Sequence, residues 1–287
     1  MRRPLGLLAS AMLLVSSAAC AGSGATAVPT VTVAPTATVA PSATVAPSAK
    51  VEASPSPDAE ALDLVVLASS LGWGVTKPYA ALASEALGRE VRVRDHIIPG
   101  AGPNDLLSLI QGSWADDVAE AEIIVFMVDP IGMGPASHLP CIPSDVGGQL
   151  GDQAGEPPDM TSVEDWQDLR DALDRTYDEI WRLRAGQPTI IRVGGTFYPW
   201  LAQLRQVGIE SVCMANQEVI DQVERDAAEA AGAVFVSLLD LFNGPGHDVD
   251  PDEQGWLADG THPNDAGRAL LVEALAATGW EASEPPS

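Results

Sequence analysis

A carboxylate and a histidine stand three residues apart near the carboxyl end of the chain, in Asp259-Gly260-Thr261-His262-Pro263. An acid at this spacing can accept the imidazole N–H, fix the tautomer of the ring and stabilise the imidazolium that forms when the ring takes a proton. A surface turn in which Asp259 or Thr261 only caps the following helix has the same spacing. The segment therefore offers either an acid–base pair or a helix cap.

Two serines, Ser69 and Ser70, follow the apolar run Leu64–Ala68. A serine at the carboxyl end of a strand can act as a nucleophile when a histidine base reaches it. Both hydroxyls could instead cap the backbone of the loop. The glycines of Gly72-Trp73-Gly74 lack the third glycine of a dinucleotide-binding loop, and the sequence contains no Gly-x-Ser-x-Gly elbow of the ordinary α/β-hydrolases.

Together, the two segments resemble the first and last sequence blocks of the SGNH hydrolases, also called the GDSL esterases and lipases. Asp259 to Asn264, followed by Gly267, is similar to the family's Asp-x-x-His-Pro-Asn block, and Ala68 to Gly74 aligns more loosely with Gly-Asp-Ser-Leu-Thr-x-Gly. Ser70 takes the place of the nucleophile, and Ser69 stands where the family has aspartate. The resemblance covers nearly all of 62–280 and implies that Ser70, His262 and Asp259 form a triad that hydrolyses an ester.

The resemblance also implies oxyanion donors besides the Ser70 N–H. The glycine block corresponds to Ile97 to Gly102, which makes the Gly100 N–H a donor, and a tight turn that needs glycine is compatible with this role. The third block has Asp129 where the family has an asparagine. An amide donates to a developing oxyanion, whereas an ionised carboxylate repels it. Asp129 could be protonated, could face away while another N–H serves, or could lie one residue out of register; alternatively, the domain binds its ligand and turns it over poorly.

Other residues of types that could bind a metal or line a binding pocket also have structural explanations. The acidic segment His247 to Glu253 begins like a calcium loop, but Pro251 and Glu253 break the pattern, so we expect a solvated loop. His96 and His138 have no partners at metal-site spacing and are expected to be structural. Neither a metal nor a cofactor is expected. Three tryptophans could line a sugar or acyl pocket or pack in the core: Trp73, Trp200 and Trp256.

Strands alternate with helices along the chain, which predicts a parallel sheet covered on both sides, with its site at the strand carboxyl ends. The expected fold class is α/β, a three-layer sandwich around a five-stranded parallel sheet, and the resemblance makes it the flavodoxin-like SGNH hydrolase fold. The expected strands are Leu64–Ala68, Val91–Ile98, Ile123–Val128, Thr189–Val193 and Val234–Leu239. Helices are expected at Lys77–Leu87, from an Asn104 cap to Ile110, from a Thr161/Glu164 capping box to Gly186, at Gln217–Ala231 and from Pro263.

The amino terminus has the layout of a secretory signal, with Arg2 and Arg3, an apolar run from Leu5 to Val15 and small residues before Cys20. The run is shorter than the roughly 20 residues of a spanning helix. The residues before Cys20 resemble a bacterial lipobox, which implies lipidation of Cys20 and an anchor in the bacterial cell membrane; a plain cleaved signal is the alternative.

Four segments are therefore expected: a lipoprotein signal at 1–20, a tether at 21–57, one domain at 58–280 and a flexible tail at 281–287. The tether is rich in Pro, Ala, Thr and Ser, a composition that cannot bury enough apolar surface to fold. Cys141 and Cys213 remain as an even pair in an exported protein, so we expect a disulfide worth about 4 kcal/mol; two buried thiols are the alternative.

A formal charge of −25 excludes binding to nucleic acid through phosphate neutralisation and disfavours docking on anionic lipid. The sequence thus predicts a monomeric, exported serine esterase whose substrate is an O-acyl glycan or a lipid or small acyl ester, with membrane contact only through the lipid anchor. The alternative is a catalytically weak lipoprotein of the same fold that binds glycan or envelope components.

Overall fold

The computed structural model describes residues 60–130, 133–135, 141–142 and 158–285. The signal segment with Cys20, the tether at 21–57 and His138 lie outside these ranges. Within them, no helix is both long enough and apolar enough to cross a membrane.

Five parallel strands form the central sheet, in the order β2-β1-β3-β4-β5, which confirms the predicted fold class. The strands are β1 (Leu62–Ala68), β2 (Val91–Ile97), β3 (Ile123–Met127), β4 (Ile190–Gly194) and β5 (Val234–Val236). β1 lies between β2 and β3, so the loop after Ala68 leaves the sheet between the loops that follow these two strands.

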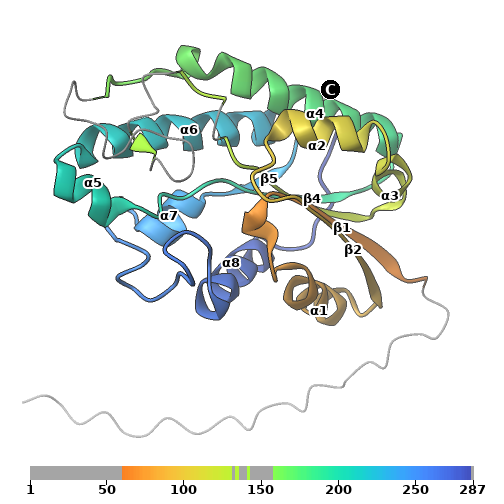
Figure 1. Ribbon diagram of the computed structural model, residues 1–287. Helices are drawn as coiled ribbons and strands as arrows, with labels where there is room; N and C mark the ends of the chain where they lie inside the picture. The colour runs from red at the N-terminus through yellow and green to blue at the C-terminus, as the bar shows by residue number, and fades with distance from the viewer. Residues whose placement is uncertain (1–59, 131–132, 136–140, 143–157, 286–287) are drawn as a thin grey trace, which may run out of the picture. The chain divides into compact units, whose positions relative to one another are not determined.

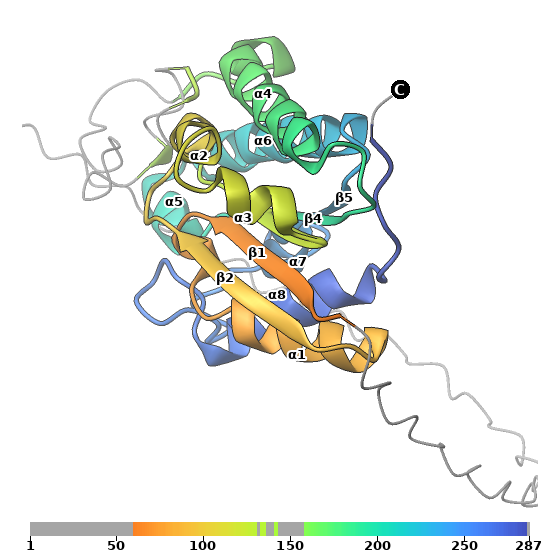
Figure 2. The same ribbon diagram turned by 90° about the vertical axis from the view of Figure 1, so that its right-hand side faces the viewer.

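Helices cover both faces of the sheet (Figures 1 and 2). One face carries α1 (Thr76–Leu87), α7 (Leu238–Asn243) and α8 (Asp265–Ala277). The other carries α2 (Pro103–Ile110), α3 (Ala115–Glu120), α4 (Gln167–Arg184) and α6 (Glu210–Ala230). A short helix, α5 (Leu201–Val207), packs against α6.

The alternation of side chains along β1 explains why both faces need helices. Val65 and Leu67 join the core under α2, α4 and α6, while Leu64 and Val66 join the core under α1 and α8. All four are fully buried. An apolar strand of this kind is stable only between two helical layers.

Several expected boundaries are wrong, and local caps set two of them. The fifth strand ends at Val236, since Ser237 accepts the Asp240 N–H at 3.0 Å and starts α7. The capping box before α4 is formed by Ser162 and Asp165 rather than by Thr161 and Glu164. α6 begins at Glu210, earlier than expected.

Two further caps differ from the sequence prediction. Asn104 lies inside α2, whose N-cap is Gly102. Pro263 precedes α8 rather than opening it, because Asn264 is the N-cap and accepts the N–H groups of Ala266 and Gly267 at 2.9 and 3.1 Å.

The segment expected as a flexible tail contains a packed residue. Ser283 is buried, its N–H donates to the Thr189 carbonyl at 2.7 Å, and the Ile191 N–H donates to its hydroxyl at 3.1 Å. This part of the segment therefore lies against the start of β4.

Candidate active site

Ser70 stands at the first residue of a short 3₁₀ turn, Ser70–Gly72, directly after β1. Ser69 fixes the entry to this turn: its N–H donates to the Met127 carbonyl at 2.8 Å, and its buried hydroxyl accepts the Leu71 N–H at 3.4 Å. A Cβ on Gly72 would lie 2.6 Å from the Cβ of Ala68, so the turn requires glycine there. Of the two serine hydroxyls, Ser69 caps the loop and Ser70 is left for other contacts.

The loop before α8 holds Asp259 and His262 in one tight turn. Asp259 Oδ1 accepts the N–H groups of Thr261 and His262 at 3.1 and 2.8 Å, and Gly260 between them has a φ of 77°. The Ala258 N–H donates to the His262 carbonyl at 2.8 Å, which closes the turn.

Asn264 ties this turn to its surroundings as well as capping α8. Its side-chain amide donates to the carbonyls of Gly255 and Leu257 at 2.7 and 3.1 Å. Asn264 therefore binds both the first turn of α8 and the segment 255–257 that precedes the tight turn, and these contacts hold the His262 backbone in place.

Ser70, His262 and Asp259 lie in one hydrogen-bonded chain. The Oγ of Ser70 is 3.1 Å from Nε2 of His262, and Nδ1 of the same ring is 2.9 Å from Oδ2 of Asp259. With the proton on Nδ1, the ring donates to Asp259 and accepts from the Ser70 hydroxyl. Hydrogen bonds from the His262 backbone N–H and the His262 ring hold the pKa of the Asp259 carboxyl below its usual range.

Two aromatic side chains contact the turn that carries Asp259 and His262, which we call the acid–base loop. Trp73 packs against the His262 ring with 4.9 Å between ring centroids. The indole N–H of Trp200 donates to the Thr261 hydroxyl at 3.4 Å. Of the tryptophans considered in the sequence, Trp73 and Trp200 thus reach the site, whereas Trp256 packs edge-on against Phe242 in the core.

The residues expected to supply oxyanion donors, Ser70, Gly100 and Asp129, all line one cavity. Gly100 has a φ of 70°, which favours glycine, and it lines the same pocket as Ser70. Among the hydrogen bonds between described residues, none uses the N–H of Ser70 or of Gly100. Asp129 follows β3, donates its own N–H to the Ala101 carbonyl at 3.3 Å and lines the pocket.

A cavity of about 410 Å³ opens next to Ser70 and His262. This volume lies in the range of small-molecule sites. No lysine or arginine of the described residues lines the cavity. Its apolar walls include Trp73, Ile142, Trp166, Tyr198, Trp200 and Ile220.

A polar network that the sequence analysis missed forms another part of the cavity. The Thr196 N–H and hydroxyl donate to Glu224 at 3.0 and 3.3 Å, and Gln217 donates to the Thr196 hydroxyl at 2.9 Å. Burial, with the charges of Asp221 and Asp129, raises the pKa of Glu224 well above its usual range. Thr196 follows β4 at the sheet edge, so the strand-end rule that pointed to Ser70 would also have pointed to this residue.

The remaining candidates have structural contacts. His96 lies 2.7 Å from Asp117 and stacks on Trp114. In the acidic loop, Asp250 accepts the N–H groups of Ala202 and Asp252 at 2.6 and 2.9 Å. The described part of the chain contains no group of three or more His, Cys, Asp or Glu residues arranged to hold a metal.

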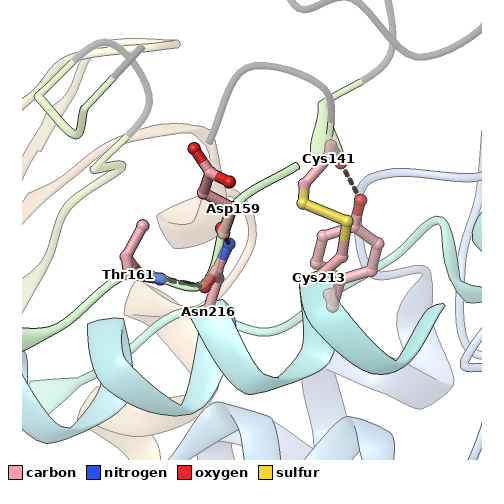
Figure 3. The surroundings of a disulfide bond; sticks show 6 residues. Cys141, Asp159, Thr161, Cys213 and Asn216 are labelled. Atoms are coloured by element: carbon pink, nitrogen blue, oxygen red, sulfur yellow. Dashed lines mark hydrogen bonds between the residues drawn. A yellow bond between two sulfur atoms is a disulfide. The ribbon is translucent and has the colours of Figure 1, made fainter. Parts of the chain in front are cut away.

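Cys141 and Cys213 form a disulfide, with 5.4 Å between their Cα atoms, which confirms the predicted pairing (Figure 3). Cys213 lies in the first turn of α6, and both cysteines are fully buried. Their neighbours in the core include Tyr198 and Trp200, so the bond lies close to the pocket wall.

No protein-family model matches the sequence, and no curated protein matches it significantly. Solved structures do match. A lipase from a goat rumen metagenome superposes with a TM-score of 0.54 at 15% identity, over 77% of this chain and 98% of the lipase. A mutant of an acetyl-xylooligosaccharide esterase from Geobacillus Stearmophilus gives 0.50 at 15% identity, over 75% of this chain and 93% of the esterase. The chain therefore has the fold of the SGNH hydrolases.

Proposed function

We propose that the protein is an exported serine hydrolase of the SGNH family that cleaves carboxylic esters. The observation that carries this proposal is the hydrogen-bonded chain from Ser70 through His262 to Asp259, of which Ser70 and His262 line the cavity. A serine, a neutral histidine and an oriented carboxylate in this order activate a hydroxyl for attack on a carbonyl.

In the proposed reaction, the Ser70 oxygen attacks the ester carbonyl while His262 Nε2 takes the hydroxyl proton. The tetrahedral intermediate then collapses, His262 returns the proton to the leaving alcohol, and an acyl-serine remains. Water, deprotonated by His262, hydrolyses the acyl-serine and restores the Ser70 hydroxyl. Asp259 keeps the ring in the productive tautomer and stabilises the imidazolium in both halves of the reaction.

The N–H groups of Ser70 and Gly100 are the proposed oxyanion donors, since no partner among the described residues uses them. Asp129 occupies the place of the family's third donor. An ionised carboxylate at this place opposes negative charge on the substrate oxygen, and loss of one donor costs about 3 kcal/mol in a well-studied protease. We therefore expect a slower esterase than an asparagine at position 129 would give.

The natural substrate is proposed to be an O-acyl glycan or a lipid ester outside the cell. Two solved structures of the same fold are a lipase and a mutant of an acetyl-xylooligosaccharide esterase, and both substrate classes suit a domain tethered through a lipid on Cys20. Cys20→Ala tests the anchor: the protein should move from the membrane fraction to the medium, and retention on the membrane would contradict lipidation.

The second candidate function is a weakly catalytic lipoprotein that binds glycan or envelope components in the same cavity, and Asp129 is the residue that favours it. Hydrolysis of a panel of 4-nitrophenyl esters separates the two functions. Activity that Ser70→Ala and His262→Ala each reduce by about a thousandfold or more supports the esterase. Absence of activity on the whole panel supports the binding protein, and activity that survives both substitutions contradicts the triad.

A further inference from the structure

The connection between β3 and α4 is attached to the start of α6 at two points (Figure 3). Cys213 holds Cys141 through the disulfide. One helical turn later, Asn216 accepts the Thr161 N–H at 2.7 Å and donates to the Asp159 carbonyl at 3.0 Å. Asn216 is fully buried, so its side chain serves this attachment and no solvent contact.

Both attachments lead directly to walls of the cavity beside Ser70. Ile142 follows Cys141, is 3% exposed and lines the cavity. At the second attachment, the indole N–H of Trp166 donates to the Thr161 hydroxyl at 3.1 Å, and Trp166 lines the cavity as well. The first turns of α6 thus hold two apolar walls in place.

The covalent attachment is the stronger constraint on Ile142. Among the described residues, Cys141 and Ile142 have one hydrogen bond to the rest of the domain, in which the Tyr198 hydroxyl donates to the Cys141 carbonyl. With the disulfide open, that bond and apolar packing are the contacts from the described residues that would still position Ile142. Opening the disulfide would therefore remove the covalent constraint on the position of Ile142.

The residues that line the cavity indicate which kind of acyl group it binds. Its walls are mainly apolar, Ser70 lines it, and Asp129 is the acidic residue among the described residues that line it. No lysine or arginine of the described residues lines it, so these residues offer no cationic partner to an acyl group that carries a carboxylate. An uncharged apolar chain would gain about fourfold in binding for each buried methylene.

We propose that the Cys141–Cys213 disulfide is a specificity-determining element: it holds Ile142 as a wall of a pocket for an uncharged acyl chain longer than acetyl. This proposal rests on the proposed ester hydrolysis and names its substrate class. Its consequence is that the preference for longer acyl chains depends on the oxidation state of the two cysteines.

The test compares kcat/KM for 4-nitrophenyl octanoate and 4-nitrophenyl acetate. In the oxidised protein the octanoate-to-acetate ratio should be well above one. The paired substitution Cys141→Ser with Cys213→Ser should lower the ratio about tenfold, mainly through KM for octanoate, and reduction of the native disulfide should do the same. Ile142→Ala keeps the disulfide and should lower the ratio similarly, so it tests the wall even if loss of the disulfide unfolds the protein.

Two controls isolate the effect. Val207→Ala changes an exposed valine on α5 outside the cavity and should leave the ratio unchanged. Reductant should have no further effect on the serine pair. If the ratio in folded Ile142→Ala and in the folded serine pair equals that of the native protein, the proposal is overturned.

Binding without chemistry separates this proposal from the proposed function. In Ser70→Ala, the uncharged ketone 2-decanone should change tryptophan fluorescence, because three of the cavity walls are Trp73, Trp166 and Trp200. Its Kd should rise about tenfold when Ile142→Ala or the serine pair is added. Binding with this pattern but no ester hydrolysis would refute the esterase and retain the pocket, whereas hydrolysis without any dependence on acyl length or on Ile142 would refute the pocket and retain the esterase.

Discussion

His262 Nε2 lies 3.1 Å from the Oγ of Ser70, although 192 residues separate them in the chain. The parallel sheet makes this contact, since β1 delivers Ser70 to its carboxyl edge and the loop before α8 returns His262 to the same edge. Chemistry that depends on both residues should therefore respond to changes in either loop.

Asp259→Asn should lower kcat for 4-nitrophenyl acetate by about a hundred- to a thousandfold. The equivalent change in a buried protease triad costs about 10⁴-fold, and we expect less here because the Asp259 side chain is 58% exposed. The asparagine oxygen can still accept the Thr261 and His262 N–H groups, so circular dichroism should be unchanged. An unaltered kcat would remove Asp259 from the mechanism.

Asp129→Asn should raise kcat by about a hundredfold, because an amide donor would replace a carboxylate beside the oxyanion. The control is Asp248→Asn, which removes the same charge from an exposed loop and should leave kcat unchanged. A lower or unchanged kcat for Asp129→Asn would mean that the carboxylate does not oppose the reaction.

The stability of the loop after α7 should depend on pH through His247. Burial lowers the pKa of this histidine, but hydrogen bonds to Asp240 and Glu218 outweigh burial and raise it overall. A raised folded-state pKa stabilises the protein fully below about pH 6.5, the unfolded value, and this contribution is lost as pH rises through the higher folded value.

His247→Asn removes the titration and tolerates the φ of 52° at this position, since asparagine adopts left-handed backbone readily. The native protein should exceed the variant in Tm at pH 5.5, by an amount that corresponds to under about 1 kcal/mol because both carboxylates are more than half exposed. The difference should shrink at pH 9. A difference that grows with pH would contradict the assignment.

Gly267→Ala should displace the acid–base loop, because Gly267 in the first turn of α8 packs against that loop. A Cβ at this position would overlap the Trp256 carbonyl oxygen and lie 3.1 Å from the Pro263 Cβ, next to His262. Overpacking of this kind costs about 1–3 kcal/mol of unfolding free energy, and the shifted loop should also lower kcat. Urea unfolding and kcat test this, with the exposed neighbour change Ala266→Ser as the control; native values for both quantities would contradict the packing argument.

The sequence predicted the sheet because its strands are continuous apolar runs, and it pointed to Asp259 and His262 because their turn is local. Ser70 followed from its place after the first strand. The walls of the cavity could not be predicted in the same way, since Thr161 and Asn216 meet across 55 residues and Trp166 reads as an ordinary helical core position. Two predicted boundaries were wrong because of local caps: Ser237 ends the fifth strand early, and Asn264 rather than Pro263 sets the start of α8.

Covalent labelling tests the central claim most directly. An uncharged fluorophosphonate reacts with a serine only when a neighbouring base activates it, so peptide mass spectrometry of the labelled protein should place one adduct on Ser70. The adduct should disappear in His262→Ala and persist in Val207→Ala. An adduct on another residue, or ester hydrolysis by a protein whose Ser70 stays unlabelled, would contradict the account.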